Sequence, residues 1–339
     1  MLRLLGILLT VLCAIGAAIL TWPDFFRLER TYPLAQVISF RTLVTVAFAV
    51  LLVVALLLAA ARPLRRLAVA LAAVALVAVV INAGIVVSRG TGTQTLPDKT
   101  ADSIRVMTWN TAGDVTSAAT IAQTAVAMGA DIVSLPETTI ETGAEVAVAM
   151  RELGRPMWAH HTEYGSDGWA ADSTTLLISP DLGTYSVIES SSDGSSNTST
   201  VPSAVAMPTD GDGPIVVAAH AVAPRQSFMA DWRHDLQWLA DQCADGNVIM
   251  AGDFNATVDH MGRLGLDGGT LGRCTDAASR TGNGSVGTWP TGLPALAGAA
   301  IDHVLATQNW TPTGSVVLTS LDDAGGDHRP LVVQLERTG

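Results

Sequence analysis

The stretch VIMAGDFNATVDH, residues 248–260, decides both the fold and the kind of site to expect. Its apolar run, residues 248–251, has the length and composition of a buried strand. The run stops at a glycine, and Asp253 and Asn255 follow one residue apart. Buried polar groups without partners are costly. The two side chains therefore either form a turn, for which Asp and Asn are well suited, or belong to a site at the mouth of a sheet.

Other strand-like segments also carry polar side chains at an end. Residues 104–110, 131–137 and 214–220 finish in Asn110, Glu137 and His220, and residues 300–307 and 325–335 begin near Asp302, Asp327 and His328. Helical patterns over 116–130 and 227–243 alternate with these strands, which indicates an α/β protein. Ligand sites in such proteins gather where strands end and loops begin. Carboxylate and amide oxygens suit Mg²⁺, Mn²⁺ or Ca²⁺ better than zinc, so the pattern predicts a metal-assisted site.

The first 90 residues have a different composition. Three apolar runs, 4–22, 43–61 and 67–87, are each about 20 residues long, the length that a helix needs to cross a bilayer. We predict a membrane anchor of three transmembrane helices over 1–87, a flexible linker over 88–102, and a catalytic domain over 103–339. A cleaved signal peptide is an alternative for the first run, but two spanning helices would remain. Buried helices of a soluble domain are the other alternative.

Arginine placement predicts the orientation in the membrane. Arg62, Arg65 and Arg66 lie in the short loop between the second and third runs, and positively charged short loops stay in the cytoplasm. This places the N-terminus inside and everything after residue 87 outside. The loop between the first two runs argues the other way, because it carries Arg27, Arg30 and Arg41. We predict a multi-pass cell-membrane protein whose catalytic domain is extracytoplasmic.

Charge and cysteine content limit the possible partners. From Ala101 onward the chain has 10 Arg and no Lys against 28 Asp and Glu, a formal balance of −18. Non-specific binding to nucleic-acid phosphates requires a basic face, and this average charge argues against one. Cys13 lies in the first apolar run. Cys243 and Cys274 either form a disulfide, as an exported domain permits, or stay as buried thiols.

The motifs VMTWN, DIVSLPE, VVAAHAVAP, AGDFNA, IDHVL and GGDHRPL occur in an order that resembles the endonuclease/exonuclease/phosphatase superfamily. That group includes DNase I-like nucleases, apurinic-site endonucleases, neutral sphingomyelinases and inositol polyphosphate 5-phosphatases. The resemblance extends from Ser103 to about Leu335. It implies a four-layer α/β sandwich, in which two packed mixed β-sheets are flanked by helices and the site opens at one end. Here that sandwich is preceded by the three predicted transmembrane helices.

The resemblance also implies a role for each polar group. Asn110, Glu137 and Asp327 match metal ligands, which would bind Mg²⁺ or, as the alternative, Mn²⁺. Asp253 matches the residue that orients or deprotonates the attacking water. Asn255 matches the amide that holds a water molecule or a phosphate oxygen.

The histidines carry the remaining implied roles. Asp302 matches the carboxylate that pairs with His328, and that pair acts either as a charge-stabilising imidazolium or as a general base. His220 matches a histidine that contacts the phosphate or protonates the leaving group. His303 is expected to be structural, because its side chain points to the other face of its strand. Trp289 either lines the cleft or packs in the interior.

These features together predict a membrane-anchored, divalent-metal-dependent phosphoester hydrolase. The expected activity is that of a phosphodiesterase acting outside the cytoplasm on a lipid, an envelope component or a nucleic acid. The expected partners are the membrane lipid bilayer and the phosphoester substrate, with no obligate protein partner. An extracellular DNase I-like nuclease and a catalytically silent membrane-bound binding module are the alternatives.

Overall fold

The computed structural model of the chain describes residues 2–93, 95–113, 115–165, 169–188, 190–192 and 195–338. Its apolar strand segments form two mixed sheets of six strands each. In the first sheet the order is β11-β12-β1-β2-β4-β3. Strands β1 and β2 are parallel, and the other neighbours are antiparallel. The members are β1 (Ser103–Thr108), β2 (Ile132–Pro136), β3 (Trp158–Glu163), β4 (Ser173–Ile178), β11 (Trp310–Val317) and β12 (Leu331–Arg337).

The second sheet has the order β5-β6-β7-β8-β10-β9. Its parallel pair is β7 and β8, and β10 pairs antiparallel with β8. The members are β5 (Tyr185–Val187), β6 (Ala204–Pro208), β7 (Ile215–His220), β8 (Val248–Asp253), β9 (Thr275–Asp276) and β10 (Asp302–Ala306). The first six residues of the stretch VIMAGDFNATVDH therefore form a central strand, VIMAGD, that is buried along its whole length.

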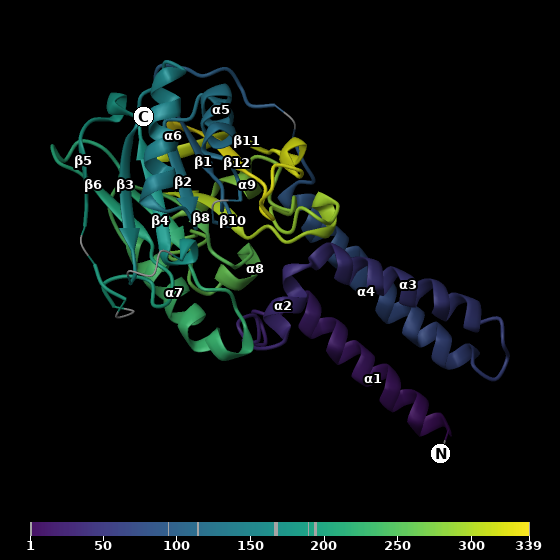
Figure 1. Ribbon diagram of the computed structural model, residues 1–339. Helices are drawn as coiled ribbons and strands as arrows, with labels where there is room; N and C mark the ends of the chain where they lie inside the picture. Colours follow the sequence, from purple (N-terminus) through teal and green to yellow (C-terminus); the bar gives the residue numbers. More distant parts are fainter. Residues whose placement is uncertain are drawn as a thin grey trace.

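The two sheets pack face to face, and helices cover their outer faces (Figure 1). Val106, Ile249 and Val304 belong to the apolar core between the sheets. Helices α5 (Ala118–Met128) and α6 (Ile140–Glu152) bury an apolar face on the first sheet, and α7 (Met229–Gln242) does so on the second. These four layers confirm the predicted fold class.

Short helical segments lie in the connections. They are α8 (Val258–Met261), α9 (Ala277–Arg280) and the 3-10 turns η1 (Ala170–Asp172), η2 (Pro180–Leu182), η3 (Gln226–Phe228), η4 (Ala295–Ala297) and η5 (Thr319–Leu321). The longer helices have clear ends. For example, the Ser117 side chain caps α5 by accepting a hydrogen bond from the Thr120 N–H, and Gly129 ends it in the left-handed conformation.

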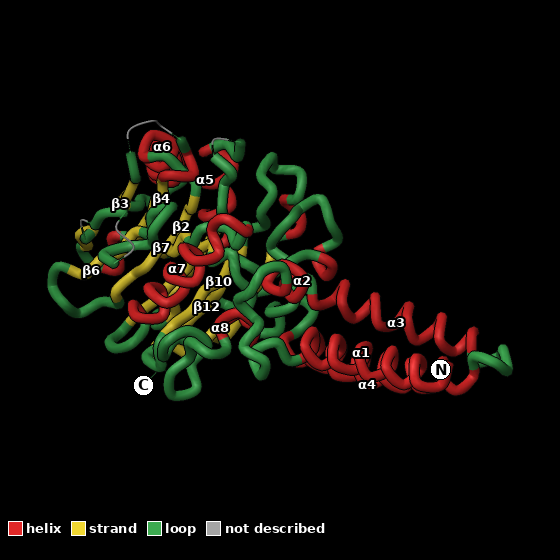
Figure 2. Tube along the Cα trace, turned by 90° about the horizontal axis from the view of Figure 1, so that it is seen from below, coloured by secondary structure: helices red, strands yellow, loops and turns green. Residues whose placement is uncertain are grey.

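Three N-terminal helices are long and apolar enough to cross a membrane: α1 (Leu2–Thr21), α3 (Arg41–Leu58) and α4 (Arg65–Arg89). The short helix α2 (Leu34–Ser39) lies between the first two. The three long helices extend together from one side of the sandwich, and α2 lies beside α8 where they meet it (Figures 1 and 2). Residues 22–40 and the sandwich therefore lie at the same end of this helix bundle.

One carboxylate joins the bundle to the sandwich. Asp259 in α8 accepts hydrogen bonds from two arginines: from Nε and Nη2 of Arg41 at 2.9 and 2.7 Å, and from Nη1 and Nη2 of Arg89 at 2.8 and 2.7 Å. Arg41 also donates to Asn82 Oδ1 at 2.7 Å, and Asn82 donates to Thr21 Oγ1 at 2.9 Å. Arg41, Asn82 and Thr21 are buried. We call the three groups Arg41, Arg89 and Asp259 the ionic junction.

The predicted linker begins inside α4, which ends at Arg89. The residues that follow contact the sandwich, apart from Gln94, which lies outside the described residues. Thr93 donates from Oγ1 to the Ser315 carbonyl at 2.7 Å, and the Lys99 ammonium lies 2.5 Å from the Asp131 carboxylate. In Figure 1 this segment runs up the side of the sandwich and enters β1 at the end far from the helix bundle.

Cys243 and Cys274 form a disulfide, which decides between the two alternatives left by the sequence. The bond joins the residue after α7 to the loop before β9 and closes a sequence separation of 31 residues. Cys13, the remaining cysteine, is free and lies in α1.

Candidate functional site

Strand register brings the predicted polar residues of the second sheet together. In the parallel pair β7 and β8, His220 is paired with Asp253. In the antiparallel pair β10 and β8, Asp302 is paired with the same residue. Three polar groups from distant parts of the sequence therefore meet at one edge, because each lies at the strand end that reaches this edge.

The first sheet supplies the other half of the same edge. Asn110 follows β1, and Glu137 follows β2, which runs parallel to β1. His328 precedes β12, whose first residue, Leu331, is paired with Thr108 at the end of β1. The sheets are tied together close by, since Ser134 Oγ donates to the Ala251 carbonyl at 2.8 Å.

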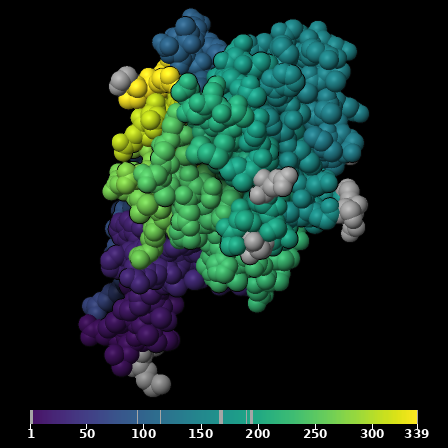
Figure 3. Space-filling view, turned by 90° about the vertical axis from the view of Figure 1, so that its left-hand side faces the viewer, coloured from purple at the N-terminus to yellow at the C-terminus, as the bar shows by residue number. Residues whose placement is uncertain are grey.

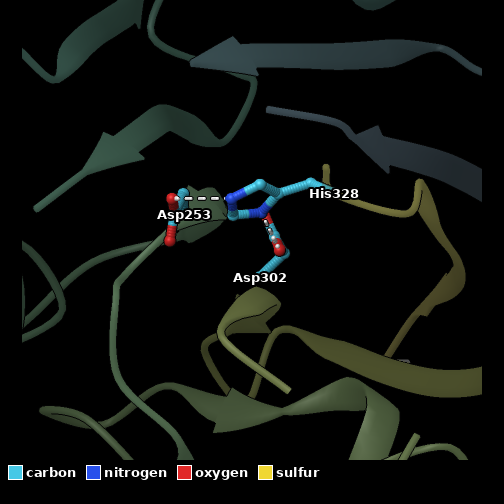
Figure 4. A group of neighbouring side chains, drawn as sticks. All are labelled: Asp253, Asp302 and His328. Carbon is cyan, nitrogen blue, oxygen red and sulfur yellow. Dashed lines mark hydrogen bonds and ion pairs between the residues drawn. The ribbon is translucent and has the colours of Figure 1, made fainter. Parts of the chain in front are cut away.

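His328 lies between two carboxylates (Figure 4). Its Nδ1 is 2.8 Å from Asp302 Oδ2, and its Nε2 is 3.8 Å from Asp253 Oδ2. Asp253, Asp302 and His328 are all buried. The main chain is held as well, because the buried Trp109 donates from Nε1 to the His328 carbonyl at 3.0 Å. The ring therefore has one orientation, with Nδ1 directed at Asp302.

Charge raises the pKa of His328. Burial by itself lowers this pKa, but the carboxylates of Asp302 and Asp253 outweigh it and raise the value to about 10. The pKa of Asp253 is also raised, to about 7, by burial and by the neighbouring Asp302 charge, against the attraction of His328. An imidazole that faces two carboxylates keeps its proton at neutral pH. The geometry thus favours the imidazolium form of the two predicted roles for His328.

Asn255 holds Asp253 in place. Its backbone N–H donates to Asp253 Oδ1 at 2.8 Å, and its side-chain amide donates to the Ala221 carbonyl at 2.9 Å and to Asp253 Oδ2 at 3.3 Å. Asn255 has φ +46°, in the left-handed region that asparagine tolerates better than most residues. The amide therefore links the end of β8 to the loop after β7.

Asn110 connects the carboxylates of Glu137 and Asp253. Its amide nitrogen donates to Glu137 Oε1 at 3.1 Å and to Asp253 Oδ2 at 3.0 Å, and its Oδ1 accepts from the Ala112 N–H at 2.9 Å. The Glu137 side chain is 30% exposed, whereas Asn110 and Asp253 are buried. Glu137 therefore marks the open side of the group.

The residues around Glu137 fit a hard divalent cation. Such ions bind through one or two carboxylates and keep several water molecules, and Glu137 combines a carboxylate with partial exposure, with the Asn110 amide adjacent. Ligand atoms of Asp253, Asp302 and His328 also lie within 4.8 Å of one another. That buried group suits a shared proton better, because Asp302 already occupies Nδ1 of His328.

Asp327, the third predicted metal ligand, is engaged elsewhere. It is exposed, and its Oδ2 accepts a hydrogen bond from Trp289 Nε1 at 2.9 Å. Among the described residues, no hydrogen bond or ion pair joins Asp327 to Asn110 or Glu137. A role for Asp327 in metal binding stays a prediction.

His220 is buried and neutral. Burial, followed by the positive charge of His328, lowers the pKa of His220 to about 3. Its Nε2 lies 3.9 Å from Glu137 Oε1, and its Nδ1 has no hydrogen-bond partner among the described residues. A neutral imidazole can donate an N–H hydrogen bond to a phosphate oxygen, but it holds no spare proton for a leaving group at neutral pH.

The remaining predicted residues lie outside this group. His303 is buried and bonds Asp276 Oδ1 and the Ala256 carbonyl, each at 2.8 Å, which agrees with the structural role expected for it. Trp289 is half-buried and packs against Phe40 with ring centroids 6.1 Å apart. It contacts the rim residue Asp327 rather than the buried group.

Two supporting residues are not apparent from the sequence motifs. Arg329 is fully buried, donates to Asp322, and binds four carbonyls of the loop that carries Trp289; these belong to Gly287, Pro290, Thr291 and Leu293. Thr288 Oγ1 accepts from the Asp302 N–H at 3.1 Å. The signal for Arg329 was its place directly after His328, because a charged residue entering an apolar strand requires buried partners.

A two-sheet α/β sandwich with carboxylates, an amide and an imidazolium at one edge defines a protein of the DNase I-like class. The chain belongs to the Endonuclease/Exonuclease/phosphatase family, which matches residues 107–328. This confirms the resemblance inferred from the motifs. Members of the family are hydrolases, with nucleases and phosphatases among them.

Solved structures of bacterial family members share the fold. An endonuclease/exonuclease/phosphatase from Beutenbergia cavernae DSM 12333 is similar with TM-score 0.55 and 19% identity, over 70% of this chain and 72% of that chain. A protein of the same family from Leptotrichia buccalis C-1013-b has TM-score 0.51 and 12% identity, over 69% and 99% of the two chains. None of the curated proteins matches the chain. Identities this low establish the fold and leave the substrate to be inferred from the site.

Proposed function

We propose that the protein is a membrane-anchored phosphodiesterase that depends on a divalent metal ion, with Mg²⁺ as the expected ion and Mn²⁺ as the alternative. The observation that carries the proposal is the position of His328 between Asp302 and Asp253, beside the pair formed by Asn110 and Glu137. A positively charged donor, a carboxylate with a raised pKa and a partly open carboxylate are the groups that phosphoester hydrolysis requires at one place.

Each residue has a proposed task. A divalent ion held by Glu137 and Asn110 would supply positive charge at the phosphoryl oxygens. Asp253, whose pKa is raised to about 7, would orient the attacking water and accept its proton. The His328 imidazolium would stabilise the negative charge of the transition state, with Asp302 holding it.

Two further groups position the reactants. Asn255 would keep Asp253 aligned through the contacts described above. His220 would donate a hydrogen bond to a phosphate oxygen from its neutral ring. Asp327 would lie at the rim as an additional metal ligand only if it left Trp289.

We propose that α1, α3 and α4 span the cell membrane and that the sandwich lies outside the cytoplasm. Three spans put residues 22–40 and the sandwich on the same side of the membrane, which agrees with the contacts between them. Disulfides form and persist in oxidising compartments, so the bond between Cys243 and Cys274 supports the outward placement. The arginine-rich loop between α3 and α4 supports it as well.

Metal removal tests the catalytic proposal. The full-length chain in detergent is expected to hydrolyse a generic aryl phosphodiester with Mg²⁺, to lose roughly 1,000-fold of that rate in EDTA, and to recover it with Mg²⁺ or Mn²⁺, because the ion supplies several kcal/mol of charge stabilisation. Glu137→Gln should raise the Mg²⁺ concentration needed for half the maximal rate. A rate unchanged by EDTA contradicts metal dependence. If the protein hydrolyses neither the aryl phosphodiester nor lipids, DNA or RNA, the catalytic proposal fails and the alternative is the catalytically silent binding module.

Topology has a separate test. An alkaline phosphatase fused after Gly339 is expected to be active in intact cells, and a fluorescent protein that matures only in the cytoplasm should stay dark at the same position. Under denaturing, non-reducing conditions one thiol, Cys13, should react with a maleimide, and three should react after reduction. An inactive phosphatase fusion together with a bright fluorescent fusion would place the sandwich in the cytoplasm and overturn the outward assignment.

A further inference from the structure

The segment that joins α1 to α3 contacts the loops that carry the candidate site. The side-chain amide of Gln36 donates to the Pro224 carbonyl, in the loop after His220. The Ala35 carbonyl lies 3.0 Å from His260 Nε2, in the helix that follows Asn255. Phe40 packs on Trp289, which bonds Asp327. The candidate site therefore opens at the edge of the sandwich that faces the helix bundle.

Aromatic side chains cluster at the same place. Trp22, Phe25 and Phe26 lie directly after α1 and are 48%, 80% and 38% exposed. Tryptophan collects where a membrane meets water. In the proposed membrane arrangement Trp22 therefore marks the level of the bilayer surface, and Figure 3 shows the purple N-terminal segment against the green surface of the sandwich.

Three arginines lie near one another at this end of the sandwich. Arg233 of α7 donates from Nη1 to the backbone carbonyl of Arg30 at 3.3 Å. Burial lowers the pKa of Arg30, and the nearby charges of Arg263 and Arg233 lower it further, against the opposing Glu29 carboxylate. Glu29 pairs with Arg30 and is itself buried. We call Arg30, Arg233 and Arg263 the basic surface.

Arg233 and Arg263 belong to a domain that carries a formal balance of −18 from Ala101 onward. Arg30 is paired with Glu29, whereas Arg233 and Arg263 are exposed and have no ion-pair partner among the described residues. These two guanidinium groups are therefore free to bind an anion. Guanidinium groups bind phosphate through paired N–H donors. At the surface of a bilayer, the phosphate available to these arginines is that of a lipid headgroup.

The helix bundle contains a groove that could hold a hydrocarbon chain. A cavity of about 340 Å³ runs between α1 and α4 and is lined almost entirely by apolar side chains, including Ala14, Ala18, Val77 and Ile81, up to Trp22. Trp22 thus borders both the groove and the aromatic cluster. A lipid whose acyl chain lies in the groove would place its headgroup beside Trp22, in the segment that carries Arg30.

We propose that the basic surface binds the phosphate groups of anionic phospholipids and presents a membrane lipid to the candidate site as its phosphodiester substrate. The second half of this statement rests on the proposed function. A duplex nucleic acid is disfavoured as the substrate. It would have to enter the space between the bilayer and the sandwich, and the sandwich is strongly acidic.

Native mass spectrometry of the full-length protein in detergent tests the surface without any activity. Wild type, titrated with phosphatidylglycerol or phosphatidylcholine, is expected to retain more phosphatidylglycerol. The variant R233Q/R263Q should bind phosphatidylglycerol on the order of tenfold more weakly, because two arginines near an anionic surface are lost. The control R151Q/R337Q removes two exposed arginines from α6 and β12 and should match wild type. Equal retention of phosphatidylglycerol by all three proteins would overturn the proposal that the basic surface binds anionic phospholipids.

Hydrolysis tests the substrate class. With Mg²⁺, wild type in phosphatidylglycerol vesicles is expected to add water across one P–O bond, releasing glycerol phosphate and leaving diacylglycerol in the vesicle. The ratio of vesicle hydrolysis to aryl phosphodiester hydrolysis should fall about tenfold in R233Q/R263Q. Hydrolysis of the aryl compound or of plasmid DNA, with vesicles untouched, overturns the lipid assignment while the proposed function stands. Inertness on every substrate overturns the proposed function, and lipid retention still decides the surface.

Discussion

Replacing His328 by Ala is expected to lower kcat on an aryl phosphodiester by roughly 1,000-fold, because in the proposed mechanism the imidazolium is the buried positive charge that would face the reacting phosphate. Asp302→Asn should lower kcat by about 100-fold, since an amide cannot hold the ring in its charged form across the 2.8 Å contact. The measurement is steady-state kinetics of the full-length chain in detergent with saturating Mg²⁺.

The double variant distinguishes a dyad from two independent residues. H328A/D302N should be no slower than H328A, because two groups that act as a unit do not lose rate additively. His234→Ala is the matched control: this exposed histidine on α7 lies outside the group and its loss should leave kcat unchanged. Additive losses in the double variant would show that Asp302 acts apart from His328.

Replacing Asp259 by Asn is expected to loosen the sandwich from the helix bundle. The carboxylate is the shared partner of Arg41 and Arg89, and its charge is strongly favoured there, because the two guanidinium groups outweigh the effect of burial and hold the pKa of Asp259 well below its usual range. Removing one partner of a buried ion pair costs about 3–5 kcal/mol. Hydrogen exchange of the amides in α2 and α8 should accelerate about 100-fold or more.

A surface ion pair provides the comparison. Asp267 and Arg273 lie 3.2 Å apart with side chains 65% and 48% exposed, and exposed pairs contribute at most about 1 kcal/mol. Asp267→Asn should therefore leave exchange in α2 and α8 unchanged. Unchanged exchange in Asp259→Asn as well would mean that the apolar contacts alone hold the bundle to the sandwich.

The central strands could be predicted from the sequence because each is a short apolar run that ends in a polar residue. β1, β2, β7, β8 and β10 all lie within one or two residues of the expected positions. The edge strands could not. β3, with the sequence WAHHTE, is half-buried and polar, and β9 has two residues, so neither shows a periodic apolar pattern. Their place depends on pairing with a neighbour, which is a tertiary effect.

The site could be predicted at the level of strand ends and not at the level of contacts. Asp253, Asp302 and His328 meet because of strand register. The sequence does not reveal that the Asn255 amide bonds the Ala221 carbonyl, or that Trp289 bonds Asp327. Arg41, which the sequence shows only as a loop charge, is a buried partner of Asp259, because the pairing crosses 218 residues of chain.

The segment after α4 determines which end of the sandwich meets the helix bundle. A short loop can join a helix to a neighbouring strand. Here the described residues 90–93 and 95–102 instead run along the sandwich to its far end before β1 turns back (Figure 1). Had β1 begun next to α4, its polar end would lie about 20 Å farther away, the length of a six-residue strand. Shortening this segment should therefore move the polar end of β1 relative to the three long helices, although no residue of the segment belongs to the candidate site.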